Sequence, residues 1–279
     1  MFDLTNFNKE KVANILINFI KNEVEKFNFK KVVVGLSGGI DSALSCTLAS
    51  LALGKENVYP IFMPYKTSSK ESYKHAKLLC EKLDLNLMVI DITPQIDTYF
   101  SYLDKINFPN KKLKLRKANK MARERMTILY DIAYELNALV LGTSNKSEIL
   151  IGYFTRWGDQ ANDLNPIGDL YKTQVWELAK FLNIPKEIIN KPPSADLWVG
   201  QTDEKEIGIS YEILDKILFG YVDLRMKKED LYKYFEKNLV DKVISKIQLS
   251  QYKRLLPIIC KISSRAVDKE FLYSRDILH

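Results

Sequence analysis

Short apolar runs and longer amphipathic segments alternate along the first half of the chain. The runs are rich in Val, Ile and Leu at consecutive positions, which is typical of strands buried on both faces. Strands separated by helices imply right-handed crossovers and a parallel sheet. The predicted strands are Lys31–Leu36, Val58–Met63, Asn86–Asp91 and Leu139–Gly142, with Leu164–Ile167 as a candidate fifth strand. The predicted helices between them are Asp41–Leu53, Ser68–Leu83 and Lys117–Leu136.

Helical periodicity also precedes and follows this α/β region. Apolar side chains from Val12 to Phe27 share one face and predict an N-terminal helix over residues 8–28, with Asn8 as its cap. Three further stretches predict a helical C-terminal portion: Tyr211–Leu218, Lys228–Phe235 and Leu239–Leu256. Because no linker, repeat or low-complexity segment interrupts the chain, we expect a single domain. Its predicted extent is 1–279, with an α/β core over 31–185 and a helical part over 205–260.

Composition narrows the class of protein without identifying it. The chain has 279 residues, is 46% hydrophobic and 28% charged, and carries a net charge of +7. These values are ordinary for a globular protein and suit an anionic substrate, but they do not by themselves indicate nucleic acid. The sequence lacks a long apolar run, so we expect no membrane partner. Three scattered cysteines, Cys46, Cys80 and Cys260, predict a reduced, cytoplasmic protein without a disulfide framework or a zinc site.

The first predicted strand runs directly into a glycine-rich turn and then into a helix. Two adjacent glycines let a backbone approach a ligand closely, and the N–H groups at a helix N-terminus bind anions. Asp41 adds a carboxylate that can hold Mg²⁺ beside phosphates. The spacing differs from a Walker A loop. The alternative is an ordinary strand–turn–helix junction rich in small residues. The predicted phosphate cradle is Gly35, Leu36, Ser37, Gly38, Gly39, Ile40, Asp41 and Ser42.

This cradle resembles the SGGxDS loop of the ATP pyrophosphatase superfamily, also called PP-loop enzymes. Members of that superfamily cleave ATP between the α and β phosphates and adenylate their substrate. Thr143 and Glu148 follow another predicted strand end, so Glu148 could join Asp41 on Mg²⁺. Taken alone, Glu148 would be read as an exposed helix glutamate.

A basic segment, KANKMARERM, precedes that strand and carries Arg123 and Arg125. Guanidinium groups can bind phosphate or carboxylate through two hydrogen bonds. A solvated basic face is the alternative for most of its lysines. A nucleic-acid patch is a third interpretation, but interleaved aromatics suitable for stacking are missing, so we predict no nucleic-acid partner.

Polar and aromatic residues gather again after the last strand, where a long loop is predicted. Arg156 beside Trp157 could stack on a flat ring, and Asp159 follows closely. Lys172 stands at the predicted start of a helix and could reach phosphate. The segments KPPSADL, with Ser194, and YKRLLP are weaker signals, and ordinary loop and helix residues remain the alternative for both.

Together these segments resemble the NAD synthetase family over roughly residues 10–275. The matching motifs occur in the family's order: SGGIDSA, KANKMARERM, GTSNKSE, GYFTRWGD, DLNPIGDLYKTQV, KPPSADL, DEKEIGISYEILD and YKRLLP. The resemblance implies an adenine nucleotide alpha hydrolase-like (Rossmann-like) fold. It also implies ATP-dependent amidation of deamido-NAD (nicotinic acid adenine dinucleotide) to NAD with ammonia, through an adenylated carboxylate, with release of AMP and pyrophosphate.

The resemblance also implies roles for individual residues. The cradle Gly35–Ser42 would bind the ATP phosphates. Asp41 and Glu148 would hold Mg²⁺, and Asp41, Asp159 and Lys172 would act in catalysis. The further ATP contacts would be Thr143, Lys172 and Ser194. The deamido-NAD contacts would be Arg123, Arg156, Asp159, Tyr252 and Lys253. The family fold implies a homodimer.

Some positions depart from the family pattern. Many members have an Asp-His pair where Ser144 and Asn145 stand, often Thr at Ser194, and often His at Tyr252. The predicted phosphate loop begins within the first 40 residues. That start leaves no room for an N-terminal glutaminase domain of about 250 residues. We therefore expect an ammonia-dependent enzyme, unless a separate glutaminase subunit supplies the ammonia.

Other PP-loop enzymes are rival interpretations. A tRNA thiolase or lysidine synthetase would be favoured by paired cysteines or an RNA-binding appendage, and a GMP synthetase by an amidotransferase domain. A nucleotide-binding module without catalysis is the rival from another class. The acidic pair Asp41 and Glu148 argues against it, because a pure binder does not need the metal.

Overall fold

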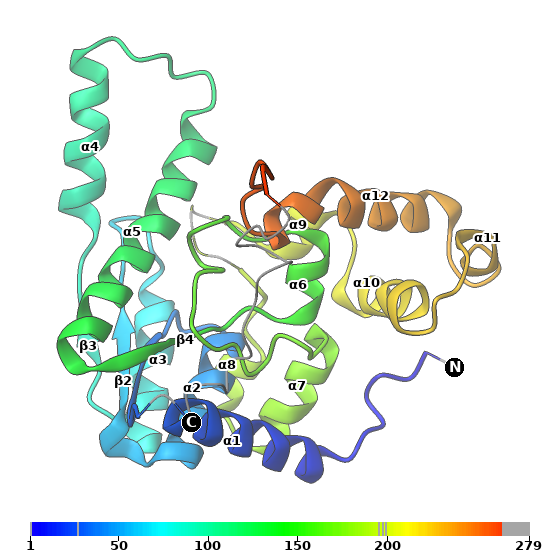
Figure 1. Ribbon diagram of the computed structural model, residues 1–279, viewed down its shortest axis with the longest axis horizontal. Helices are drawn as coiled ribbons and strands as arrows, with labels where there is room; N and C mark the ends of the chain where they lie inside the picture. The colour runs from blue at the N-terminus through cyan, green and yellow to red at the C-terminus, as the bar shows by residue number, and fades with distance from the viewer. Residues whose placement is uncertain (1, 27, 195, 197, 199, 264–279) are drawn as a thin grey trace.

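A parallel sheet of four strands forms the centre of the molecule (Figure 1). The computed structural model describes residues 2–26, 28–194, 196, 198 and 200–263. The strands lie in the order β3-β2-β1-β4, and every neighbouring pair is parallel. Helices lie between successive strands and flank the sheet, which confirms the predicted α/β class.

The observed strands agree with the predicted ones except at the edges of the sheet. They are β1 (Lys31–Gly35), β2 (Val58–Phe62), β3 (Met88–Val89) and β4 (Ala138–Leu141). The third strand is much shorter than predicted because it pairs on one side only, with β2. The candidate fifth strand was wrong. It contributes a single parallel bridge between Leu141 and Leu164 within the described residues.

Alternate side chains of β1 enter two different hydrophobic clusters. Val32 and Val34 pack with one cluster and Val33 with the other, and all three are fully buried. This is the period-two pattern of a strand covered on both faces. The first cluster includes side chains from α1 (Lys9–Glu25), α2 (Ile40–Leu53), α3 (Lys70–Leu83), α7 (Lys172–Phe181) and α8 (Lys186–Ile189). The second includes side chains from α4 (Thr93–Lys105) and α5 (Leu113–Leu136).

The helices α4 and α5 form a hairpin that projects from the sheet (Figure 1). Sequence reasoning missed α4 and began α5 at Lys117 instead of Leu113. Only Ile96 and Phe100 of α4 are buried, so its apolar stripe is narrow and easily overlooked. Pro94 in the first turn of α4 is a position that tolerates proline, because that N–H has no partner within the helix.

The predicted N-terminal helix is observed as α1, and Asn8 caps it. The Asn8 side chain accepts a hydrogen bond from the Lys11 backbone N–H at 2.8 Å. Short elements fill the connections: η1 (Lys55–Asn57), α6 (Lys146–Ile151), α9 (Asp203–Ile207) and the π-helical turn η2 (Phe219–Asp223).

A third hydrophobic cluster lies beside the sheet and holds the C-terminal helices (Figure 1). The predicted helices are observed as α10 (Tyr211–Leu218), α11 (Lys228–Leu231) and α12 (Lys237–Arg254), of which α11 is shorter than expected. Side chains of α6 and Tyr171 also join this cluster. The C-terminal helices therefore pack against the segments that lead into α6 and α7.

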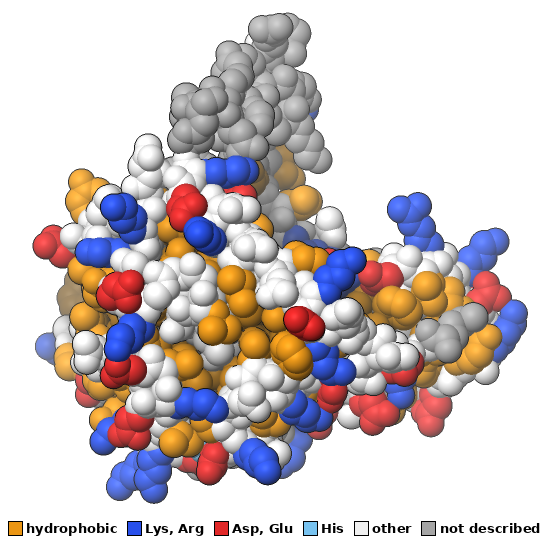
Figure 2. Space-filling view, turned by 90° about the horizontal axis from the view of Figure 1, so that it is seen from below, with side chains coloured by type: hydrophobic (Ala, Val, Ile, Leu, Met, Phe, Trp, Pro, Cys, Tyr) orange, Lys and Arg blue, Asp and Glu red, His pale blue; other side chains and the backbone are white. Residues whose placement is uncertain are grey.

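Charged side chains of both signs are spread over the visible surface of the molecule (Figure 2). On the face in Figure 2, basic side chains are interspersed with acidic ones and form no continuous basic stripe. Across the described residues, no helix has both the length and the apolarity to cross a membrane. All three cysteines are free thiols, with Cys46 and Cys80 buried. Cys260 is exposed, because it lies beyond the end of α12.

Candidate active site

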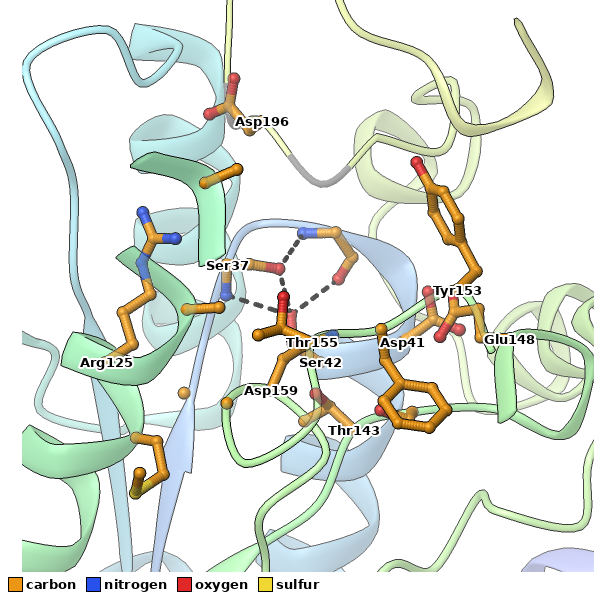
Figure 3. A pocket seen from close by; sticks show the side chains of 18 of the residues that line it. Ser37, Asp41, Ser42, Arg125, Thr143, Glu148, Tyr153, Thr155, Asp159 and Asp196 are labelled. Atoms are coloured by element: carbon orange, nitrogen blue, oxygen red, sulfur yellow. Dashed lines mark hydrogen bonds between the residues drawn. The ribbon is translucent and has the colours of Figure 1, made fainter. Parts of the chain in front are cut away.

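The turn between β1 and α2 is held open by hydrogen bonds among its own residues (Figure 3). The hydroxyls of Ser37 and Ser42 lie 3.0 Å apart, and the Ser37 N–H donates to the Ser42 oxygen at 3.1 Å. Gly38 has a φ of +74°, and a Cβ there would lie 2.1 Å from the Ser72 carbonyl oxygen. The loop conformation therefore requires glycine at this position.

A cavity of about 800 Å³ lies beyond the carboxyl ends of β1, β2 and β4. This is the position at which open parallel sheets bind ligands. Every site residue predicted from the sequence lines this cavity except Gly38, which faces Ser72 instead. The predicted residues on the wall are Gly35, Leu36, Ser37, Gly39, Ile40, Asp41, Ser42, Arg123, Thr143, Glu148, Arg156, Asp159, Lys172, Ser194, Tyr252 and Lys253.

A buried lysine stands between two carboxylates at the end of the phosphate cradle. Lys172 is only 1% exposed, forms an ion pair with Asp41, and lies 3.7 Å from a carboxylate oxygen of Glu148. Burial disfavours the Lys172 ammonium, but the charges of Asp41 and Glu148 outweigh burial and raise the pKa of Lys172. The lysine is therefore a fixed positive charge beside the cradle.

The two carboxylates are themselves held in place. Burial and the charge of Asp41 hold the pKa of Glu148 well above its ordinary value, although the Lys172 ammonium opposes part of the shift. The Asn145 side chain donates to Asp41 at 2.9 Å and also caps α6 by accepting from the Glu148 N–H at 3.0 Å. Asn145 thus ties Asp41 to the first turn of α6.

The donor set at this point suits a hard cation. Among the described residues no group of three or more His, Cys, Asp and Glu side chains is arranged to hold a metal by itself. Asp41 and Glu148 nevertheless converge on one cation, the Lys172 ammonium, and both line the cavity. Two carboxylates supplemented by phosphate oxygens are a usual ligand set for Mg²⁺. The residues present therefore fit this ion.

Basic and aromatic side chains form the wall contributed by the loop after α6. The Arg156 guanidinium lies 4.9 Å from the Trp157 ring centre and 5.9 Å from that of Tyr252. It also donates to the Leu255 carbonyl oxygen at 2.9 Å. Arg123, on α5, donates twice to the Arg156 carbonyl oxygen, at 3.3 Å each. Both guanidinium groups thus help to hold the wall itself.

Lys253 and Asp159 hold the same loop from its two ends. The Lys253 ammonium donates to the carbonyl oxygens of Gly152 at 2.7 Å and Phe154 at 2.9 Å. Asp159 accepts from the Thr155 N–H at 2.9 Å, and its side chain opens to the cavity. The protein mass around this carboxylate desolvates it and raises the pKa of Asp159.

Comparison with known proteins identifies the family. A family model described as NAD synthase matches residues 12–257. The chain belongs to this family. It is 50% identical over 272 residues to the NH(3)-dependent NAD(+) synthetase of Trichlorobacter lovleyi, and the match covers 97% of each chain. It is also 50% identical over 258 residues to the enzyme of the same name from Fusobacterium nucleatum, covering 91% of this chain and 97% of that one.

Solved structures of NAD synthase relatives share the fold. The NH3-dependent NAD synthetase of Campylobacter jejuni is 34% identical, with a TM-score of 0.76, over 91% of this chain and 100% of the other. The NMN synthetase of Francisella tularensis is 31% identical, with a TM-score of 0.81, over 92% and 100%.

Three charged wall residues of this NAD synthase chain were not assigned a role from its sequence. Arg125, half-buried on α5, donates to the Met63 carbonyl oxygen at 2.9 Å, and desolvation lowers its pKa to about 10. Lys191 donates to the Ser72 hydroxyl at 2.9 Å, beside the phosphate cradle. Burial raises the pKa of Asp203, which also lines the cavity. Arg125 carried a signal, because it lies beside Arg123 in a basic segment. Lys191 and Asp203 begin the segments KPPSADL and DEKEIGISYEILD, but neither residue was singled out within its segment.

Proposed function

We propose that this protein is an ammonia-dependent carbon–nitrogen ligase that converts deamido-NAD to NAD. ATP is the co-substrate, and AMP and pyrophosphate are released. One observation carries the proposal: a PP-loop cradle ends at the Asp41–Lys172–Glu148 cluster within a large cavity. The 50% identity to NH(3)-dependent NAD(+) synthetases over 97% of the chain supports the choice of substrates.

The chemistry needs an activated carboxylate. A free nicotinate carboxylate resists ammonia, because it is anionic and oxide is a poor leaving group. The carboxylate oxygen therefore attacks the α-phosphorus of ATP, and pyrophosphate leaves. Negative charge that develops on the phosphates is met by backbone N–H groups of the cradle and by the Lys172 ammonium. Ammonia then attacks the acyl carbon and expels AMP. Positioning provides much of the acceleration, because the protein takes no covalent part.

Asp41 and Glu148 would hold the magnesium ion of Mg·ATP. When bound there, the ion neutralises phosphate oxygens and fixes their orientation. In its absence the Lys172 ammonium balances the same carboxylates. Thr143 and Ser194, which lie on the cavity wall, are our proposed contacts for the rest of ATP.

The dinucleotide would lie against the wall formed by the loop after α6. A second hollow of about 340 Å³ shares Arg156, Trp157 and Lys253 with the main cavity. This extra room supports a dinucleotide beside ATP. Arg123, Arg156 and Lys253 would face its phosphates, and Tyr252 offers a ring for stacking.

Asp159 is our proposed partner for ammonia. The attacking species must be NH₃, whereas the solution holds mostly NH₄⁺ near neutral pH. A carboxylate with a raised pKa is better suited to accept the ammonium proton than an ordinary one. Its opening to the cavity supports this role.

The α4–α5 hairpin supports a homodimer. Large apolar side chains are exposed along this projecting hairpin, among them Tyr102, Ile106, Phe108 and Leu115. Grouped apolar exposure of this kind is typical of an interface. We place the dimer in the cytoplasm, which agrees with three free cysteines. Sedimentation equilibrium tests the dimer, and a monomer at micromolar concentration would refute it.

The decisive experiment measures NAD and AMP together. The purified protein is incubated with deamido-NAD, Mg·ATP and an ammonium salt, and Asp41→Ala serves as the inactive control. Equal amounts of NAD and AMP, abolished in the variant, are expected. A parallel reaction offers the acid form of NMN, because one solved relative is an NMN synthetase. Faster AMP formation with the mononucleotide would overturn the dinucleotide assignment.

A further inference from the structure

The helix that carries Lys172 is capped by residues from two other helices. Tyr171, at the N-cap position of α7, makes no side-chain cap hydrogen bond. Instead the Lys172 N–H donates to the Ser147 hydroxyl oxygen of α6 at 2.9 Å. The Thr173 N–H donates to a carboxylate oxygen of Asp215, on α10, at 2.8 Å. Two N–H groups that a helix start leaves without partners are thus satisfied from outside.

Ser147 and Asp215 are joined to each other. The Ser147 hydroxyl donates to the second carboxylate oxygen of Asp215 at 2.5 Å. One carboxylate therefore holds the first turn of α7 directly and α6 through Ser147. Glu148 is the next residue of α6, so the same carboxylate is connected to the backbone at Lys172 and, through Ser147, to the segment that carries Glu148. Figure 1 shows α6, α7 and α10 converging at this point.

This arrangement is costly for the fold. Asp215 and Ser147 are both 0% exposed, and neither lines the cavity. Burial raises the pKa of Asp215 to about 6, and its hydrogen bonds lower it only in part. Hydrogen bonds from the Ser147 hydroxyl and the Thr173 N–H offset part of the cost of an ionised carboxylate here. Negative charge at a helix N-terminus is favourable, and here that N-terminus begins with Lys172.

We propose that Asp215 is a positioning residue that fixes Lys172 and Glu148 in the geometry needed for adenylation. This inference rests on the proposed function, in which Lys172 acts on the ATP phosphates. Asp215 touches neither substrate nor metal; it acts through Ser147 and the first turn of α7. A displacement of about 1 Å at reacting groups can lower a rate by about 100-fold. A fall in kcat of about 10- to 100-fold is therefore expected when this carboxylate is lost.

The test uses Asp215→Asn and, as a milder change, Ser147→Ala in the full chain. For each we measure kcat and KM for deamido-NAD at saturating Mg·ATP and ammonia. Bound ATP per chain gives the fraction of active sites. A positioning role lowers kcat per active site and changes KM by less than about two-fold. The double variant is no slower than the slower single variant, because both changes break one chain of hydrogen bonds.

Asp223→Asn is the matched control. Asp223 is also a carboxylate near the start of α7, where it accepts from the Lys146 ammonium at 2.8 Å and from the Tyr171 hydroxyl. It makes no hydrogen bond to Lys172, Ser147 or Thr173 among those described. A kcat within about two-fold of wild type is expected for this variant.

Each result decides the matter. A purely structural role would lower the melting temperature and the active fraction while kcat per active site stayed at the wild-type value, and that result overturns the inference. If Asp215→Asn does not fold, Ser147→Ala with unchanged kcat overturns it equally. Failure of the proposed function is seen separately, in the wild-type protein, as AMP without NAD. The ratio of AMP formation by variant and wild type then still tests Asp215. If the wild type forms neither AMP nor NAD, the proposed function and the inference about Asp215 are both overturned.

Discussion

Replacing Lys172 by methionine should destabilise the fold far more than loss of an exposed lysine. The side chain is 2% exposed, and its ammonium is the nearest positive charge to Asp41 and Glu148 in the described ion pairs. Methionine fills a similar volume but leaves two half-buried carboxylates without a counter-charge. Removing one partner of a buried pair costs about 3–5 kcal/mol. An unfolding entropy of about 2.1 cal/mol/K per residue over 279 residues converts about 4 kcal/mol into a Tm lowered by about 7 °C.

The loss of stability caused by Lys172→Met should depend on pH in a definite direction. The pKa of Glu148 already lies above its ordinary value, so the folded state binds more protons than the unfolded state as pH rises through that range. Stability therefore falls as pH rises. Without Lys172 the pKa of Glu148 rises further, because the neighbouring charge of Asp41 is no longer opposed. The destabilisation by Lys172→Met should be larger near pH 8 than near pH 5, because lower pH favours protonation of Glu148 and so removes one uncompensated charge. Added Mg²⁺ should restore more stability to this variant than to the wild type.

Thermal unfolding followed by circular dichroism at pH 5 and pH 8, with and without Mg²⁺, measures these effects. Lys146→Met is the matched control, because Lys146 also pairs with two carboxylates, Asp169 at 3.0 Å and Asp223 at 2.8 Å. Asp169 is largely exposed, so Lys146→Met is expected to lower the free energy of unfolding by about 1 kcal/mol or less. A Lys172→Met variant as stable as Lys146→Met at pH 8 would refute the buried-charge reasoning.

Three further variants test other parts of the site. Gly38→Ala should lower the free energy of unfolding by about 1–2 kcal/mol from left-handed backbone strain alone. It should also weaken ATP binding, because the new Cβ would meet the Ser72 carbonyl oxygen and displace the loop. An ATP affinity equal to that of the wild type, measured by calorimetry, would count against a cradle role. Asp159→Asn should raise the apparent KM for ammonia more than that for ATP, and equal increases in steady-state kinetics would remove its assignment. Asp215 has its pKa raised from 3.8 to about 6, so the folded state binds the extra proton and wild-type stability falls as pH rises between them. The free energy of unfolding of Asp215→Asn minus that of the wild type, measured with urea, should therefore increase by up to ~3 kcal/mol between pH 4 and pH 7. A difference that does not change with pH would contradict this.

The elements predicted well are those whose signal is local. β1 is a run of three valines buried on both faces, and α2 follows it after a glycine turn. These patterns need no knowledge of distant residues. The edge strand β3 was overestimated, since Met88 and Val89 are exposed and nothing pairs with their outer side in the described structure. Burial and pairing are properties of the assembled sheet, so the extent of an edge strand cannot be read from its own residues.

The predicted site residues meet in one cavity for a topological reason. Asp41 follows β1 and Thr143 follows β4, and neighbouring parallel strands place their carboxyl ends at the same edge of the sheet. Sequence reasoning could therefore bring the motifs together without coordinates. It could not find Asn145 as a bridge to Asp41, because that hydrogen bond joins residues 104 positions apart.

The residues that sequence reasoning missed act on other side chains. A ligand contact needs a residue type suited to phosphate or metal, so residue type together with the resemblance to the family indicates it. A supporting contact needs only that two helices pack at the right angle. Ser147 and Asp215 meet because α10 packs against both α6 and α7, and each residue alone resembles any serine or aspartate in a helix. The first turn of α7, which carries Lys172, is thus held in part by contacts from the C-terminal helix α10. We infer that changes in that distant cluster will reach the active site through Asp215.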